Sequence, residues 1–586
     1  MSRKSFSFRL SSSPLRALFV MVALLGTFAL LRGPVAAAPA PDQTPVGLPL
    51  SVDAGEPPQL FQANLSGAKE VPPVMSRATG RAVLALSDDM TTLYWRILVD
   101  DITNITASHI HEGAPGENGP VIFPLFDGTG DFGPNDPVSG SITLDASQLE
   151  TLLAGNYYVN VHTTDHPAGE IRGQIEGFTP QASFNALLEG NNEVPPVTTD
   201  ALGVARFTLA NNDTLEFEVE VTEIQDITAS HIHKGRPGEN GPVILTLFDG
   251  TDTFDPDHPI DGTLTLDAEN LVDLLTGFYY VNVHTTAHPG GEIRGQIGGA
   301  RLFDAALSGS EEVPPVTTDA SGRAVLSLTA DTSTLFWRVL VDDITNITAS
   351  HIHEGAPGEN GPVIFPLFDG TGPFGPDDPI SGSFTLTADQ LFTLMAGNYY
   401  VNVHTTQNPG GEIRGQIGDL EPPTHFVANL SGDNEVPPVE TDASGTAHLT
   451  LNPLLDILHY HVMVSDIMNI TASHIHKGPS GENGPVIFPL YDGTGIFNPD
   501  HPVGGALLLN AENLVDLLTN FYYVNVHTTA HPGGEIRGQI VEEAEPTALT
   551  LGTFRTATSR ANLPWALATA SLLALAGASL AWRRQR

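Results

Sequence analysis

The chain contains no cysteine among its 586 residues, and this absence excludes several classes of protein at once. Without thiols there is no disulfide framework, no thiol nucleophile and no cysteine-bound zinc or iron–sulfur centre. The sequence also lacks a nucleophile elbow, a phosphate-binding loop and a pair of catalytic carboxylates. We therefore expect domains that are stable on their own cores, and a protein that is not an enzyme and has no catalytic residue.

Basic residues are scarce, with 25 Lys and Arg against 68 Asp and Glu, so the net charge is −43. Five of the basic residues lie in the first 38 positions and three in the last four, which leaves 17 basic and 68 acidic residues between them, a net charge of −51. Such a surface repels nucleic acid and favours cations and basic partners. We expect no nucleic-acid partner, and a protein or a cation as the ligand.

Long apolar runs occur only at the two ends of the chain. Residues 1–38 combine a basic start, an apolar run and three alanines, the order typical of a cleaved signal peptide. Residues 563–582 are twenty residues without charge, enough to cross a hydrocarbon core of ~30 Å, and the tail 583–586 is rich in arginine. The alternatives are an uncleaved signal anchor at the first end and a cleaved sorting signal at the second.

These ends predict a single-pass protein of the cell membrane. The part between them is extracellular, the C-terminus is cytoplasmic, and a Thr/Ala-rich stalk at 546–562 joins the two.

The region between the ends repeats one unit four times. The string SHIH begins at residues 108, 230, 350 and 473, so its spacings are 122, 120 and 123 residues. Three further strings, EVPPV, YVNVHTT and GEIRGQI, occur in the same order around every SHIH. The units run over 58–177, 181–299, 301–418 and 424–541, which predicts four tandem domains.

Within each unit apolar and polar residues alternate, as in LEFEVEV at 215–221, the pattern of half-buried strands. Gly and Pro clusters separate these runs, and one short helix per unit begins after a capping residue, Asp145, Asp267, Thr387 or Asn510. Short strands with regular turns favour an all-β fold, an antiparallel sandwich or barrel.

Three histidines of each unit should share one face of the sheet. Residues two apart on a strand point the same way, so His109 pairs with His111, and His162 pairs with Asn160. In the last strand Glu170, Arg172 and Gln174 share a face in the same manner. If the three strands are neighbours, each unit has a polar face that contains all these side chains.

Two interpretations of this polar face remain open. A His-x-His pair with a third His can hold zinc or copper, with Glu170 as a fourth ligand or as an acceptor behind a ligand. Alternatively, the histidines bond to backbone carbonyls and Asn160, and Glu170 pairs with Arg172. The candidate metal ligands are His109, His111, His162, His231, His233, His284, His351, His353, His404, His474, His476 and His527.

Differences between the copies show which histidines the metal hypothesis can include. His459 and His461 form another His-x-His, at positions where the second unit has Glu216 and Glu218, and the alternation places them on the solvent face. His166 is replaced by Asn408 in the third unit, so no shared function requires it.

The pattern FxAxLSG with EVPPV, SHIHEG, YYVNVHT and GEIRGQI resembles the CHRD domain, a family named after repeats in chordin, an extracellular antagonist of bone morphogenetic proteins. The resemblance covers residues 58–541 and implies extracellular, immunoglobulin-like β domains. Together with the strand and helix patterns, it leads us to expect four immunoglobulin-like or Greek-key antiparallel β-sandwich domains, each with one short helix, and the uncharged run at 563–582 adds a C-terminal transmembrane helix. It implies an extracellular binding module and no catalytic residue. A growth-factor partner is not implied, because the cysteine-rich modules of chordin are missing.

The sequence therefore predicts a membrane-anchored extracellular binding or adhesion protein with four CHRD modules. One alternative is a zinc- or copper-binding domain, or a metal-dependent redox domain, centred on the three histidines of each unit. The other is a structural spacer at the cell surface.

Overall fold

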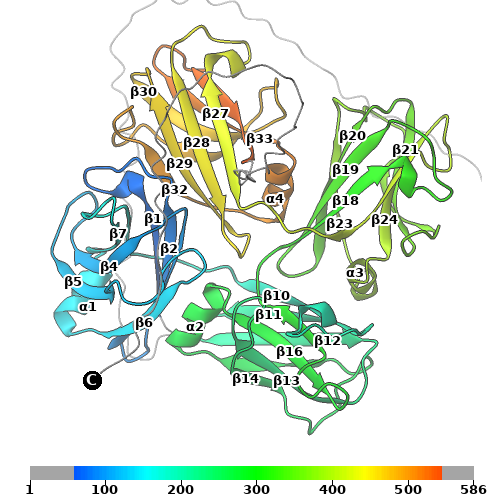
Figure 1. The fold of residues 1–586 in the computed structure, drawn as a ribbon, viewed down its shortest axis with the longest axis horizontal. Helices are drawn as coiled ribbons and strands as arrows, with labels where there is room; N and C mark the ends of the chain where they lie inside the picture. The colour runs from blue at the N-terminus through cyan, green and yellow to red at the C-terminus, as the bar shows by residue number, and fades with distance from the viewer. Residues whose placement is uncertain (1–58, 544–586) are drawn as a thin grey trace, which may run out of the picture. The chain divides into compact units, whose positions relative to one another are not determined.

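A computed structural model describes residues 59–543, which form four antiparallel β domains of the same design (Figure 1). The elements of the first domain are β1 (Gln59–Ser66), β2 (Thr79–Leu86), β3 (Thr92–Asp100), β4 (Ile105–Glu112), β5 (Val121–Phe126), β6 (Val138–Thr143), α1 (Ala146–Leu153), β7 (Tyr157–Thr163), β8 (Ile171–Gln174) and β9 (Glu176–Gly177). A 3-10 turn, η1 (Gly67–Lys69), follows β1.

The other three domains repeat this order of elements, except that an isolated bridge between Asn185 and Gly298 stands in the second domain where the first has β9. The second has β10 (Ser183–Glu189), η2 (Gly190–Asn192), β11 (Leu202–Ala210), β12 (Thr214–Thr222), β13 (Ile227–Lys234), β14 (Val243–Phe248), β15 (Ile260–Thr265), α2 (Ala268–Leu275), β16 (Tyr279–Thr285) and β17 (Ile293–Gln296). The third has β18 (Arg301–Ser308), η3 (Gly309–Glu311), β19 (Ser321–Leu328), β20 (Thr334–Asp342), β21 (Ile347–Glu354), β22 (Val363–Phe368), β23 (Ile380–Thr385), α3 (Ala388–Met395), β24 (Tyr399–Thr405), β25 (Ile413–Gln416) and β26 (Gly418–Asp419). The fourth has β27 (His425–Ser431), η4 (Gly432–Asn434), β28 (Ser444–Leu451), β29 (Ile457–Ser465), β30 (Ile470–Lys477), β31 (Val486–Tyr491), β32 (Val503–Leu508), α4 (Ala511–Leu518), β33 (Tyr522–Thr528), β34 (Ile536–Gln539) and β35 (Val541–Glu542).

Each domain is one continuous sheet. In the first domain the strands follow the order β5-β4-β7-β8-β1-β2-β3-β6, and the two end strands, β5 and β6, approach each other. The all-β, antiparallel, fourfold prediction is confirmed. The two separate sheets of a sandwich are replaced by one curled, barrel-like sheet, because Ser66 pairs with Arg172 and so joins β1 to β8.

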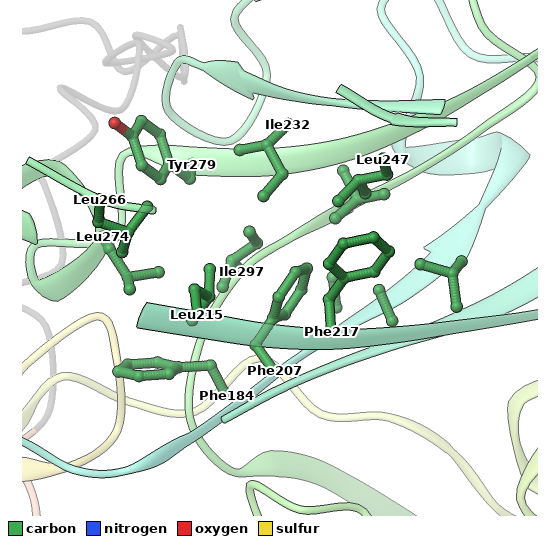
Figure 2. Close-up of a cluster of buried hydrophobic side chains, with 14 of the residues drawn as sticks. Phe184, Phe207, Leu215, Phe217, Ile232, Leu247, Leu266, Leu274, Tyr279 and Ile297 are labelled. Carbon is green, nitrogen blue, oxygen red and sulfur yellow. The ribbon is translucent and has the colours of Figure 1, made fainter. Parts of the chain in front are cut away.

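The core lies inside the curled sheet. On β12 the apolar residues Leu215 and Phe217 are buried, whereas Glu216 between them is exposed, as the alternation predicts. Figure 2 shows these side chains packed against Ile232 of β13 and Tyr279 of β16. Burial of such apolar surface contributes about 25 cal/mol per Å² and is the main force that stabilises the domain.

The four predicted helices are confirmed with their caps. The Asp145 side chain accepts a hydrogen bond from the Gln148 N–H, and the Gln148 side chain accepts one from the Asp145 N–H, which forms a capping box. Asp267, Thr387 and Asn510 accept in the same way at α2, α3 and α4.

Residues 59–543 contain no helix with the length and apolar character needed to cross a bilayer. The predicted signal at 1–38, stalk at 546–562, transmembrane helix at 563–582 and tail at 583–586 lie outside the described residues.

Candidate functional site

The polar face forms where β4, β7 and β8 lie side by side. His109 of β4 stands opposite Asn160 of β7, and Asn160 stands opposite Arg172 of β8. The prediction that these three strands are neighbours is confirmed. The sheet register therefore brings two histidines of β4 and His162 of β7 to one face.

In the first domain the three imidazoles form a compact cluster. The Nδ1 atom of His109 lies 3.1 Å from the Nε2 atom of His162. The ring centroid of His111 lies 5.6 Å from that of His109 and 5.9 Å from that of His162. In every copy one nitrogen of each of the three histidines lies within 4.8 Å of the others.

Backbone carbonyls fix the tautomers of two of the three histidines. The Nδ1 atom of His111 lies 3.0 Å from the Gly119 carbonyl oxygen, and that of His162 lies 3.2 Å from the Pro167 carbonyl oxygen. A carbonyl only accepts, so each Nδ1 carries the hydrogen and each Nε2 presents a lone pair. The same bonds recur at His233 and His284, His353 and His404, and His476 and His527.

Most of the ring nitrogens that face the centre of the cluster have no hydrogen-bond partner among residues 59–543. The buried Nε2 atom of His111 has no partner within residues 59–543. In the second domain the same holds for His231 Nδ1, His233 Nε2 and His284 Nε2, and the third and fourth domains repeat the pattern. Buried polar atoms without partners are rare in proteins and ask for an explanation.

Burial keeps these imidazoles neutral. It lowers the pKa of His162 to about 4, with a further contribution from the neighbouring His109. The pKa values of His109 and His111 are lowered as well, first of all by burial. Neutral imidazole is the form that binds metals.

Tyr158 and Arg172 support the cluster from one side. The Tyr158 ring stacks on His111 at 4.9 Å and 14°, and its hydroxyl accepts a hydrogen bond from the Gly119 N–H. The Arg172 guanidinium lies 3.4 Å from the centre of the Tyr158 ring and donates to the Glu117 carbonyl and the Asn118 side chain. These bonds hold the loop that carries the Gly119 carbonyl.

Sequence reasoning assigned Arg172 to the face but overlooked Tyr158. The signal was available, because Tyr158 lies two positions before Asn160 on the same strand.

Glu170 does not belong to the cluster. Its carboxylate accepts hydrogen bonds from the Ser76 and Thr163 hydroxyls, at 2.6 and 2.7 Å. No ion pair with Arg172 is found in the part of the chain that the structure describes. None of the three roles predicted for Glu170, as fourth metal ligand, acceptor behind a ligand or partner of Arg172, is found among residues 59–543.

A different glutamate, Glu70 of the EVPPV string, lies near Arg172. It follows η1 and its Oε2 accepts a bond from the Asn160 side chain at 3.4 Å. Burial raises the pKa of this carboxyl to about 7, although the Arg172 charge acts against the rise. Sequence reasoning noted Glu70 only as part of a repeated string, because nothing local places η1 beside β7.

The histidines that the sequence comparison set apart from the cluster are His459, His461 and His166. Within the fourth domain, Leu458, Tyr460 and Val462 of β29 point into the core, so His459 and His461 take the opposite, outer face of the sheet, as the alternation predicts. At His166 the backbone N–H bonds to the Thr163 hydroxyl, and Asn408 makes the same bond to Thr405, so this contact does not depend on the side chain.

Asn118 and Asp127, on the loops after β4 and β5, bond to other groups of the first domain. The Asn118 amide donates to the Val71 carbonyl and accepts from Arg172, and Asp127 accepts from the N–H and hydroxyl of Thr129. The bonds of Asn118 tie the loop after β4 to Val71 and Arg172, and the bonds of Asp127 shape the turn after β5.

The fold and the polar face define a tandem-repeat all-β protein in which each unit carries one cluster of three histidines. The chain matches the CHRD domain over residues 61–175, 184–297, 303–417 and 426–540. These four matches cover most of the chain, so the chain belongs to the CHRD domain family, as the sequence motifs predict.

Two curated relatives show how far the likeness extends. The chain is 24% identical to chordin of Xenopus laevis over 291 residues, which is 47% of this chain and 30% of that protein. It is 26% identical to chordin of Danio rerio over 297 residues, again 47% of this chain and 30% of the relative. The matches cover less than a third of either chordin.

Proposed function

We propose that the chain is an extracellular binding protein, anchored in the cell membrane through residues 563–582, that uses its four CHRD modules together. The observation that carries the proposal is the fourfold occurrence of one domain along the chain. Linked modules raise the effective concentration of each further contact, so weak individual contacts add up to firm attachment. No step of this function requires catalysis.

The extracellular location draws support from the sequence and the family. The segment 1–38 has the order of a secretory signal, and the surface between the ends carries a large negative charge. The CHRD family is named after repeats of an extracellular protein, which is consistent with the same side of the membrane for this chain.

Cell fractionation tests the location. The full chain should stay with membranes after alkaline carbonate washing, and protease added to intact cells should cut its repeats. A chain that lacks residues 563–586 should appear in the medium. Recovery of the full chain from the cytosol, or repeats that resist protease on intact cells, would contradict the proposal.

A shortened chain tests the use of several modules. We would place the full chain and a chain without residues 181–418 in fluorescent vesicles, and pass both over immobilised surface proteins from the producing culture. Four modules should dissociate at least about tenfold more slowly than two. Equal dissociation would favour the surface spacer, and no retention of either chain would rule out binding to these proteins.

A further inference from the structure

The three imidazoles of each copy have no role in the binding function proposed above. We propose that His109, His111 and His162, with their counterparts in the other three copies, hold one first-row divalent transition-metal ion per copy, zinc or copper. The site has three nitrogen ligands and one open coordination position. The proposal is independent of any macromolecular partner, so each of the two can fail alone.

The spacing of the nitrogens fits a metal. Two ligand nitrogens at 2.0–2.1 Å from a tetrahedral ion lie about 3.3 Å apart. His109 Nδ1 and His162 Nε2 are 3.1 Å apart in the first domain. Within each of the four copies, the three candidate ligand nitrogens lie within 4.8 Å of one another. Small rotations of the rings can reduce this distance to the spacing that a metal requires.

Protonation provides the second argument. Because the Nδ1 hydrogens of His111 and His162 point to carbonyls, both Nε2 atoms present lone pairs toward the cluster. One hydrogen on His109 Nδ1 could satisfy His162, but it would leave His111 Nε2 buried without a partner. A single cation accepts all three lone pairs.

The carbonyls at Gly119 and Pro167 have the geometry of outer-shell groups in metal sites. Ligating histidines usually donate their other ring N–H to a carbonyl or carboxylate, which orients the ring and raises its basicity. The same two bonds occur in all four copies. A cluster that served only as a hydrogen-bonded network would not need its lone pairs turned inward four times.

The donor set selects the class of metal. Three imidazole nitrogens without thiolate or carboxylate suit zinc, copper or nickel, whereas calcium and magnesium require oxygen ligands. Glu170 is already bound to two hydroxyls, so it does not complete the set. The fourth position is left to water or to a ligand group.

The first test measures metal content on the full chain without a histidine tag. We would strip the protein with a chelator, dialyse it separately against micromolar zinc and micromolar copper, and determine metal per chain by elemental analysis. We expect four ions per chain for at least one of the two metals. Less than one ion per chain for both metals would overturn the proposal.

A matched pair of variants locates the ions. His162→Asn keeps an amide N–H that can reach the Pro167 carbonyl but deletes the Nε2 ligand, and should lower the content from four ions to three. His166→Asn introduces the residue that the third copy already has at Asn408, and should leave four. Four ions in both variants would overturn the assignment.

A spectroscopic measurement keeps the test valid if His162→Asn does not fold. The electron paramagnetic resonance spectrum of the copper-loaded wild-type chain should show nitrogen hyperfine structure from three imidazoles. A spectrum of copper bound mainly by oxygen would place the ion elsewhere on the acidic surface and overturn the proposal.

Discussion

The Nδ1 atom of His109 lies 3.1 Å from the Nε2 atom of His162, although 53 positions separate the two residues in the sequence. The contact follows from the register of β4 and β7, which places Ala107 opposite His162 and leaves His109 as its diagonal neighbour. Diagonal side chains on a sheet reach one another when they are long. A slip of one residue would turn the rings to opposite faces, so the cluster depends directly on this pairing.

Metal should raise the thermal stability of the chain. At a free zinc or copper concentration of 100 times the dissociation constant, binding adds about 2.7 kcal/mol per site, which scanning calorimetry detects as a higher midpoint. The variant H162N/H284N/H404N/H527N should lose this rise. The control H166N/H288N/H531N, which makes the other copies resemble the third at this position, should keep it. An equal rise in both variants would show that the metal stabilises the chain from another site.

Replacement of the buried glutamates should change how stability depends on pH. Burial raises the pKa values of Glu70, Glu193, Glu312 and Glu435 to about 7. The folded state therefore binds a proton more tightly than the unfolded state, in which the pKa of a glutamate is near its ordinary value of 4.5. This contribution is complete below pH 4.5 and is lost as the pH rises through 7.

The histidines act in the opposite sense, because the lowered pKa of His162 makes stability fall as the pH drops from 6.5 toward 4. We expect the free energy of unfolding of the variant E70Q/E193Q/E312Q/E435Q to rise relative to that of wild type as the pH increases from 4.5 to 7, by roughly 1–3 kcal/mol per copy. Denaturant unfolding at several pH values measures the difference. Substitution of the exposed Glu150 by Gln is the control, and a difference that does not grow with pH would refute the explanation.

Two adjacent glycines of the second domain should respond very differently to alanine. Gly291 has φ +128°, and a Cβ there would collide with the Asn282 amide and the Glu193 carboxyl, whereas a Cβ on Gly290 meets nothing within 4 Å. Gly291→Ala should lower the unfolding free energy by about 2–4 kcal/mol. Gly290→Ala should change it by less than about 0.5 kcal/mol, since the first domain has Ala168 at this position. Calorimetric midpoints for the two variants that agree would contradict this description of the turn.

The buried arginine of the third domain should matter far more than an exposed one in the same domain. Arg414 is 1 % exposed, lies 3.5 Å from the centre of the Tyr400 ring and donates to the Asn360 side chain. Arg414→Met should destabilise the domain by about 2–3 kcal/mol, because the stacking on Tyr400 and the hydrogen bonds to the side chains of Asn360 and Gln416 are lost together. Arg323 pairs with Asp304 at the surface. Its replacement by Met should lower the free energy of unfolding by less than about 1 kcal/mol. Similar losses in urea unfolding would contradict the importance of the stacked arginine.

Local rules predicted much of this fold. The two-residue period of LEFEVEV gave the correct buried face of β12, and the capping residue Asp145 gave the correct start of α1. The same period grouped His109 with His111, because the side chains of a strand alternate whatever the rest of the chain does.

Features that depend on distant pairing were not predictable in the same way. The closure of the sheet depends on Ser66 meeting Arg172, which lies 106 positions further along the chain. The place of Glu70 beside Asn160 and the carbonyls that fix the tautomers come from loops whose path no periodicity specifies. These contacts are settled by packing of the whole domain rather than by local propensity.

Each histidine cluster is assembled from two strands of a single copy, so no copy borrows a ring from its neighbours. Damage to one cluster would leave the other three clusters on the same chain intact. Gain or loss of whole repeats by recombination would therefore adjust capacity in steps of one, as a gene-dosage change does, without any redesign of the unit.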